Sequence, residues 1–167
     1  MKSTTHALAE FAVNTRFEDL PAPVVHEAKR LLLDSLGCAL AGSRVEKGRI
    51  AVALAKRLGG SPESSVIGAG ASVSCAAAAF ANGELIQALD FEALLSPPGH
   101  APPLLIPAPL SLAELSGASG QELIVATVIA HEVSTRLAVA LGSRAGRIET
   151  EGGELIALRH SGVVSVI

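Results

Sequence analysis

The chain has 167 residues, enough for about one domain with a substantial core. Apolar residues make up 49% and charged residues 17%, which excludes a disordered chain and indicates that much apolar surface is covered. The net charge is −3, there is no basic run, and Trp and Tyr are absent. These features exclude a nucleic-acid surface built on positive charge or base stacking.

Helical patterns dominate the first half of the sequence. Residues 3–13 form a short amphipathic segment, and residues 46–58 form another that ends before "GGSP". Between them, residues 19–43 have an apolar stripe at spacings of three and four, with Gly42 suited to the helix end. No segment reaches the roughly 18 uninterrupted apolar residues of a membrane span, and the N-terminus has no secretory signal. We therefore expect a cytoplasmic protein with no membrane partner.

The second half continues this pattern. Residues 64–68 could be a short extended piece, residues 72–89 are Ala-rich and helical, and residues 107–117 form a helix that begins with proline. Ser119 and Glu122 form a capping box that opens a long helix, in which Glu132 and Arg136 pair at i,i+4 and which Gly142 ends. The predicted fold is an all-α bundle of about six helices, with a weak strand at most. Residues 143–167 read as an irregular tail that ends on an aliphatic run, as if interrupted.

One polar stretch, "ALDFEALLSPPGHAPP" at residues 88–103, separates two aliphatic segments. It contains Asp90, Glu92 and His100. A carboxylate within hydrogen-bond reach of an imidazole fixes its tautomer and favours its charged form, which makes the ring a usable acid or base near neutral pH. The structural alternative makes Asp90 a helix-ending residue and His100 a solvated loop histidine. Outside this stretch, we expect Asp34 to bond a neighbouring helix end or backbone group, since a buried acid needs a partner, and His131 to be structural.

Two longer segments resemble a known family. "HEAKRLLLDSLGCALAGS" (26–43) and "ANGELIQALDFEALLSPPGHAPPLLIPAPLSLAELSGASGQELIVATVIAHEVSTRL" (81–137) are similar to the N-terminal part of the MmgE/PrpD family. Its members include 2-methylcitrate dehydratase, cis-aconitate decarboxylase and iminodisuccinate epimerase. The resemblance runs over residues 5–142. It implies that residues 1–142 are the N-terminal portion of the family's helical domain, that residues 143–167 are a tail, and that the lid domain is absent.

The resemblance also implies chemistry. The family works as a homodimer, without metal or organic cofactor, on small di- and tricarboxylates, and moves a proton beside a carboxylate during dehydration, decarboxylation or epimerisation. Asp90 matches the first acid of the family's "DFDD", His100 the histidine of "HPG", and His160 a histidine in "FHPTG". These three are the expected catalytic residues. Glu92 and Arg136 are expected to contact the substrate.

This sequence departs from the family pattern in two places. Ala93 and Leu94 replace a carboxylate and a hydroxyl, and the proline of "HPG" is shifted by one position to Pro102. The lysines that the family carries downstream have no counterpart, because all four lysines here precede the motif. These losses reduce the polar rim of the expected site.

Three hypotheses follow. In the first, the chain is a lyase or isomerase in which Asp90 and His100 form the acid–base pair. In the second, it is a truncated, non-catalytic homologue that serves as a dimerisation or partner-binding module. In the third, it is a shortened enzyme that reuses the pocket for a more apolar substrate. A metal site at Asp90, Glu92 and His100 is not expected, because their spacing is not diagnostic. We expect a small carboxylate ligand and a homo-oligomer.

Overall fold

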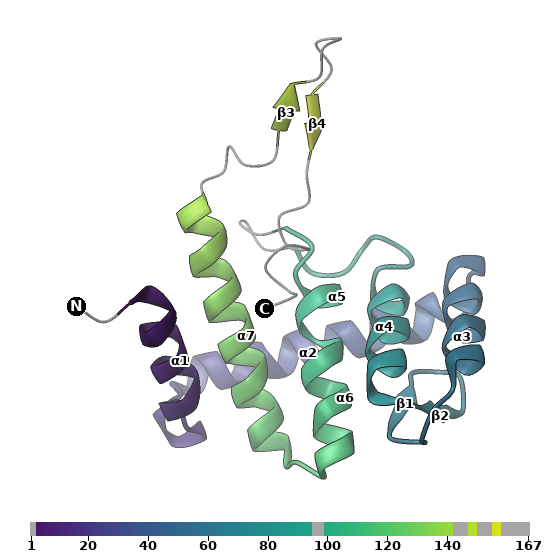
Figure 1. The fold of residues 1–167 in the computed structure, drawn as a ribbon, viewed down its shortest axis with the longest axis horizontal. Coiled ribbons are helices and arrows are strands. Elements are labelled where there is room, and N and C mark those ends of the chain that lie inside the picture. Colours follow the sequence, from purple (N-terminus) through teal and green to yellow (C-terminus); the bar gives the residue numbers. More distant parts are fainter. Residues whose placement is uncertain (1–2, 95–98, 142–146, 150–154, 158–167) are drawn as a thin grey trace.

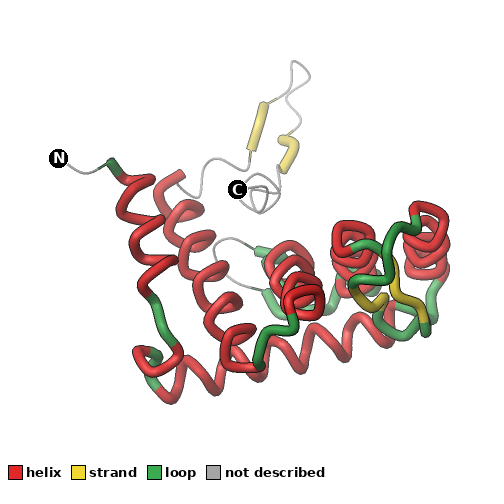
Figure 2. Tube along the Cα trace, turned by 60° about the horizontal axis from the view of Figure 1, so that its bottom comes forward, coloured by secondary structure: helices red, strands yellow, loops and turns green. Residues whose placement is uncertain are grey.

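The computed structural model describes residues 3–94, 99–141, 147–149 and 155–157, and it confirms the helical bundle (Figures 1 and 2). The helices are α1 (Thr4–Asn14), the short 3-10 helix η1 (Phe17–Asp19), α2 (Ala22–Gly42), α3 (Glu46–Leu58), α4 (Cys75–Ile86), α5 (Pro102–Leu105), α6 (Pro107–Ser116) and α7 (Gly120–Leu141). The strands are β1 (Ser64–Val66), β2 (Ala71–Val73), β3 (Arg147–Glu149) and β4 (Leu155–Ala157).

Helix α2 runs across the bundle, and α7, α6 and α4 stand in front of it in Figure 1. Helix α4 lies at the centre, where it packs against α2, α3, α5 and α6. Small residues allow these helices to approach closely. Ala39, Ala55, Ala78 and Ala81 are fully buried in the main core and are joined by larger side chains such as Leu85. The core is therefore densest around α4, whose C-terminal end leads directly into the polar stretch.

Strands β1 and β2 form an antiparallel pair beside α4, with Ser64 opposite Val73. The extended piece predicted at 64–68 is confirmed over Ser64–Val66, whereas residues 67 and 68 form a turn, and the partner strand was not predicted. The buried side chain of Asn82 on α4 accepts a hydrogen bond from the Ile67 amide (2.9 Å) and donates one to the Ser65 carbonyl (3.0 Å). One polar side chain of the central helix thus holds the hairpin in place.

The caps of the later helices match their sequence signals. Helix α6 begins at Pro107 and ends before Gly117, which adopts the left-handed conformation at φ 65°. At the start of α7, the Ser119 amide donates to Glu122 Oε2 (2.7 Å), and the Glu122 amide donates to Ser119 Oγ (3.3 Å). The capping box is therefore confirmed. The predicted stop at Gly142 lies outside the described residues.

Two features differ from the sequence prediction. Helix α5 lies inside the proline-rich connector, where Pro102 and Pro103 occupy the first helical turn. Beyond α7, β3 and β4 pair antiparallel within the segment expected to be irregular, with Ile148 opposite Ile156.

Helix α7 is long and apolar enough to cross a membrane by length and mean hydropathy. One such helix is weak support for a span, because core helices of globular proteins meet the same criterion.

Candidate functional site

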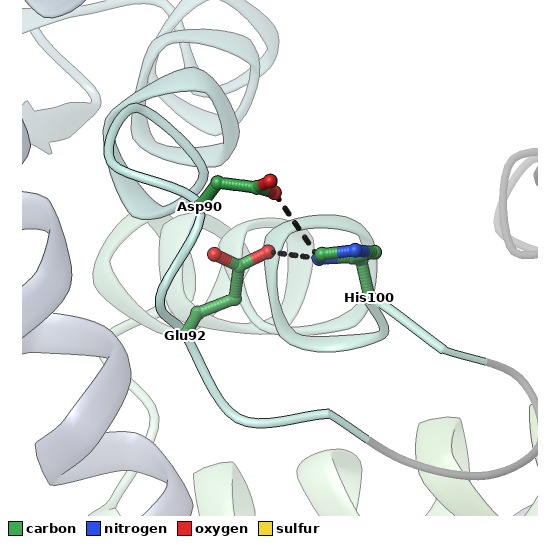
Figure 3. A group of neighbouring side chains, drawn as sticks. All are labelled: Asp90, Glu92 and His100. Atoms are coloured by element: carbon green, nitrogen blue, oxygen red, sulfur yellow. Dashed lines mark hydrogen bonds and ion pairs between the residues drawn. The ribbon is translucent and has the colours of Figure 1, made fainter.

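Three polar residues of the 88–103 stretch, Asp90, Glu92 and His100, lie close together in the fold (Figure 3). Asp90 and Glu92 follow the C-terminal end of α4, and His100 lies two residues before the start of α5. Asp90 has φ 57°, a left-handed conformation that few non-glycine residues adopt. This turn reverses the chain after α4 and brings both acids toward the histidine.

Glu92 is the acid that contacts His100 most closely. Its Oε1 lies 2.7 Å from His100 Nδ1, whereas Asp90 Oδ1 lies 3.6 Å from the same nitrogen. The Glu92 side chain is fully buried, His100 is 25% exposed, and Asp90 is 64% exposed. The second oxygen of Glu92, Oε2, is buried without a hydrogen-bond partner among the described residues. The structure therefore brings Asp90, Glu92 and His100 together, with different surroundings for the two acids.

Helix α2 contacts the turn that follows α4. Asp34 Oδ2 accepts a hydrogen bond from the Ala93 amide (3.3 Å), and the Cys38 thiol, one helical turn further along, lies 3.9 Å from the same oxygen. This contact confirms that Asp34 bonds a backbone group of another segment, but the premise that Asp34 is buried was wrong, because the residue is exposed. Burial raises the pKa of the Cys38 thiol, and the negative charges of Asp34 and Glu92 raise it further. The turn is thus fixed to α2 in a negatively charged setting.

The site is rich in acids and poor in cations. Within the described part of the chain, no Lys or Arg forms an ion pair with Asp34, Asp90 or Glu92. One ligand atom from each of Asp90, Glu92 and His100 lies within 4.8 Å of the others, so these residues could hold a divalent cation by distance. An ion there would have to replace the short contact between Glu92 and His100.

Two other predicted site residues lie elsewhere. Arg136 on α7 forms an ion pair with Glu132, which was predicted, and its guanidinium lies 5.7 Å from the ring centre of Phe11 on α1. It forms no hydrogen bond or ion pair with Asp90, Glu92 or His100. His160 lies outside the described residues. Their roles in substrate contact and catalysis stay predictions.

A groove of about 820 Å³ lies between α2 and α7 and was not expected from the sequence. It reaches Asp34 and Ala93 at the turn, but none of the three clustered residues lines it. His131 on its wall places Nδ1 2.8 Å from the Thr127 carbonyl oxygen, while its Nε2 is buried without a partner among the described residues. Burial lowers the pKa of His131, so the neutral ring is favoured. Thr127, His131 and Ser134 recur at i, i+4 and i+7, a signal of one polar stripe that the sequence does contain.

Comparison with known proteins places these features in a family. The profile of the MmgE/PrpD N-terminal domain matches residues 6–158. The chain is 32% identical over 147 residues to a cis-aconitate decarboxylase-like protein, oryM, from Aspergillus oryzae, a match that covers 83% of this chain and 30% of that protein. It is 28% identical over 143 residues to a cis-aconitate decarboxylase from Aspergillus terreus, covering 82% of this chain and 29% of that protein.

The matched region contains most of α1, all of α2 to α7 and the whole Asp90, Glu92 and His100 cluster. The chain spans about 30% of the length of the curated relatives it matches. The match begins at the first helix and covers more than nine-tenths of the sequence, so it extends well beyond one shared motif. The chain belongs to the MmgE/PrpD family and corresponds to its N-terminal domain.

Proposed function

We propose that this chain supplies the acid–base part of a lyase that acts on a small carboxylic acid. The observation that carries the proposal is the contact between His100 and a fully buried carboxylate, with a second, exposed carboxylate beside it on a left-handed turn. Two relatives are named for the decarboxylation of cis-aconitate, a tricarboxylic acid. Their names favour decarboxylation over dehydration or epimerisation for this chain.

The proposed chemistry needs one group that exchanges a proton with carbon. In decarboxylation, the bond between carbon and the departing CO2 breaks, and its electron pair stays on the carbon or delocalises into a neighbouring carboxylate. The imidazolium of His100 then gives that carbon a proton. In dehydration or epimerisation the neutral ring removes the proton first. The carboxylates of Asp90 and Glu92 lie 3.6 Å and 2.7 Å from the ring nitrogen Nδ1 and face the ring in either direction of proton transfer.

A carboxylate substrate also needs cationic donors around its own carboxylates. Among the described residues, the acids around the cluster are not paired with any Lys or Arg. We therefore propose that the cationic donors come from other parts of the protein. We also propose that Arg136 contacts the substrate and that His160 acts as an acid or base. Because the chain spans about 30% of the relatives' length, the rest of a longer protein is one source of such groups.

The test is turnover of a panel of di- and tricarboxylates, cis-aconitate included, followed by NMR of substrate and product. We expect His100→Asn to lower kcat by at least about 100-fold. His26→Asn is the matched control, because His26 is an exposed histidine on α2 with no site contact. Turnover that survives in His100→Asn contradicts the proposal. So does the absence of both turnover and ligand-induced change in melting temperature in the unmodified protein.

A second candidate function is a non-catalytic module that binds a second copy of the chain. The observation that favours it is a face of α2 on which Leu33, Leu36 and Leu40 are exposed. Light scattering at micromolar concentration tests this candidate, with Leu33→Glu and Leu40→Glu as variants. A dimer that both variants dissociate supports it, and a monomeric unmodified protein contradicts it.

A further inference from the structure

We propose that Glu92, and not Asp90, is the positioning residue of His100. In this arrangement Glu92 accepts a hydrogen bond from the Nδ1–H group of the ring, and Nε2 is the nitrogen that exchanges a proton with the substrate. The inference rests on the proposed function, in which His100 is the acid or base. It goes beyond that function because it assigns a separate task to each carboxylate and a tautomer to the ring.

The distances and the burial of the two acids carry the assignment. Glu92 Oε1 is 2.7 Å from Nδ1, within hydrogen-bond range, and Asp90 Oδ1 at 3.6 Å is beyond it. The Glu92 side chain is closed off from solvent, whereas that of Asp90 is 64% exposed. Water competes with a hydrogen bond at the exposed acid and not at the buried one, so the bond to Glu92 is the stronger of the two.

The tautomer follows from the chemistry of a carboxylate. An ionised carboxylate only accepts hydrogen bonds, so its partner nitrogen must carry the proton. In the neutral ring, a proton on Nδ1 leaves the lone pair on Nε2. No described residue forms a hydrogen bond with Nε2 of His100. Among the residues that the structure describes, this nitrogen has no partner, and in the proposal it is the one that meets the substrate.

The position of Glu92 is itself fixed from outside the site. The amide of the next residue, Ala93, donates to Asp34 on α2, which lies 59 residues away in the chain. The charge of Glu92 is close enough to Cys38 on the same helix to help raise the pKa of its thiol. Glu92 thus lies between α2 and His100, and among the described residues its carboxylate has one hydrogen-bond partner, the imidazole ring.

Two-bond 1H–15N correlation spectra of the full chain with 15N-labelled histidine test the assignment, at a pH where the rings are neutral and with a chelator present. His100 is identified by the signals missing in His100→Asn. We expect a protonated Nδ1 and an unprotonated Nε2. In Glu92→Gln, whose amide can donate or accept, we expect averaged signals of both tautomers. In Asp90→Asn, the matched control, we expect the spectrum of His100 to stay unchanged.

A protonated Nε2 in the unmodified protein overturns the inference without any need for a variant. So does a His100 spectrum that changes in Asp90→Asn and not in Glu92→Gln. In turnover assays, we expect Glu92→Gln to lower kcat by roughly 10²- to 10⁴-fold with little change in KM, as for a wrong tautomer of a catalytic histidine. If the tautomer is as expected and no carboxylate is turned over, the inference is supported and the proposed function is contradicted. If turnover is seen with Nε2 protonated, the proposed function is supported and the tautomer inference is contradicted.

Discussion

Gly42, the last residue of α2, lies directly against the backbone carbonyl of Leu85 on α4, so that a Cβ at Gly42 would overlap this oxygen. We expect Gly42→Ala to lower the free energy of unfolding by about 1–3 kcal/mol, because the two helices would have to separate. Gly37→Ala on the same helix is the control. A Cβ there meets nothing within 4 Å, so alanine should raise the free energy of unfolding by about 0.5–1 kcal/mol. Urea unfolding measures both, and equal effects would contradict the close contact.

The left-handed backbone of Asp90 predicts that its replacements differ in stability, although each of them should lower activity. Glycine adopts φ 57° without strain and alanine does not, so Asp90→Gly should be more stable than Asp90→Ala by roughly 1 kcal/mol. Both variants remove the exposed carboxylate, and both should lower turnover. Thermal denaturation followed by circular dichroism gives the stability difference. Equal melting temperatures for the two variants would show that the turn is not left-handed in solution.

His131 predicts how stability depends on pH. Burial lowers its pKa in the folded protein from an ordinary value of 6.5. Below pH 6.5 the unfolded chain therefore binds more protons than the folded one, and stability falls as the pH falls from there toward the folded pKa. Above pH 6.5 the ring is neutral in both states and contributes no pH dependence. We expect His131→Gln to lose stability less steeply than the unmodified protein between pH 6.5 and 5, in urea unfolding at each pH. Identical slopes would contradict the burial of the ring.

The two cysteines should differ in reactivity. Cys38 is buried, and burial together with the charges of Asp34 and Glu92 raises the pKa of its thiol, so that little thiolate forms. Cys75, at the start of α4, is half-buried. With iodoacetamide at pH 8, mass spectrometry should find Cys75 alkylated first and Cys38 protected until the protein unfolds. Rapid alkylation of Cys38 in the folded protein would place it outside the core.

Much of the fold could be predicted from sequence because its signals are local. The capping box of Ser119 and Glu122 and the stripe along α2 depend on residues three or four apart. Helix α5 was missed because two adjacent prolines within a proline-rich stretch indicate a connector, although both fit a first helical turn. Strand β2 was missed because its pairing with β1 depends on contacts across the hairpin and with α4.

The site was predicted in membership but not in arrangement. The residue types and the resemblance pointed to Asp90 and His100 as the acid–base pair, and the sequence analysis assigned Glu92 to substrate contact instead. Which acid comes closer to His100 depends on the left-handed turn at Asp90 and on the contact between Ala93 and Asp34. Both are tertiary features, and neither leaves a periodic pattern. The groove between α2 and α7 likewise depends on how two helices far apart in the sequence pack together.

The two hydrogen bonds of Asn82 also determine how strand β1 is aligned. Because side chains alternate between the two faces of a strand, a slip of one residue would turn Ser64 and Val66 outward and bring the exposed Ser65 into the core. A hairpin of two three-residue strands has little of its own to prevent such a slip. Asn82 accepts from Ile67 and donates to Ser65, so only one alignment satisfies both ends of its amide. A single side chain of the central helix thus determines which residues of β1 face the core.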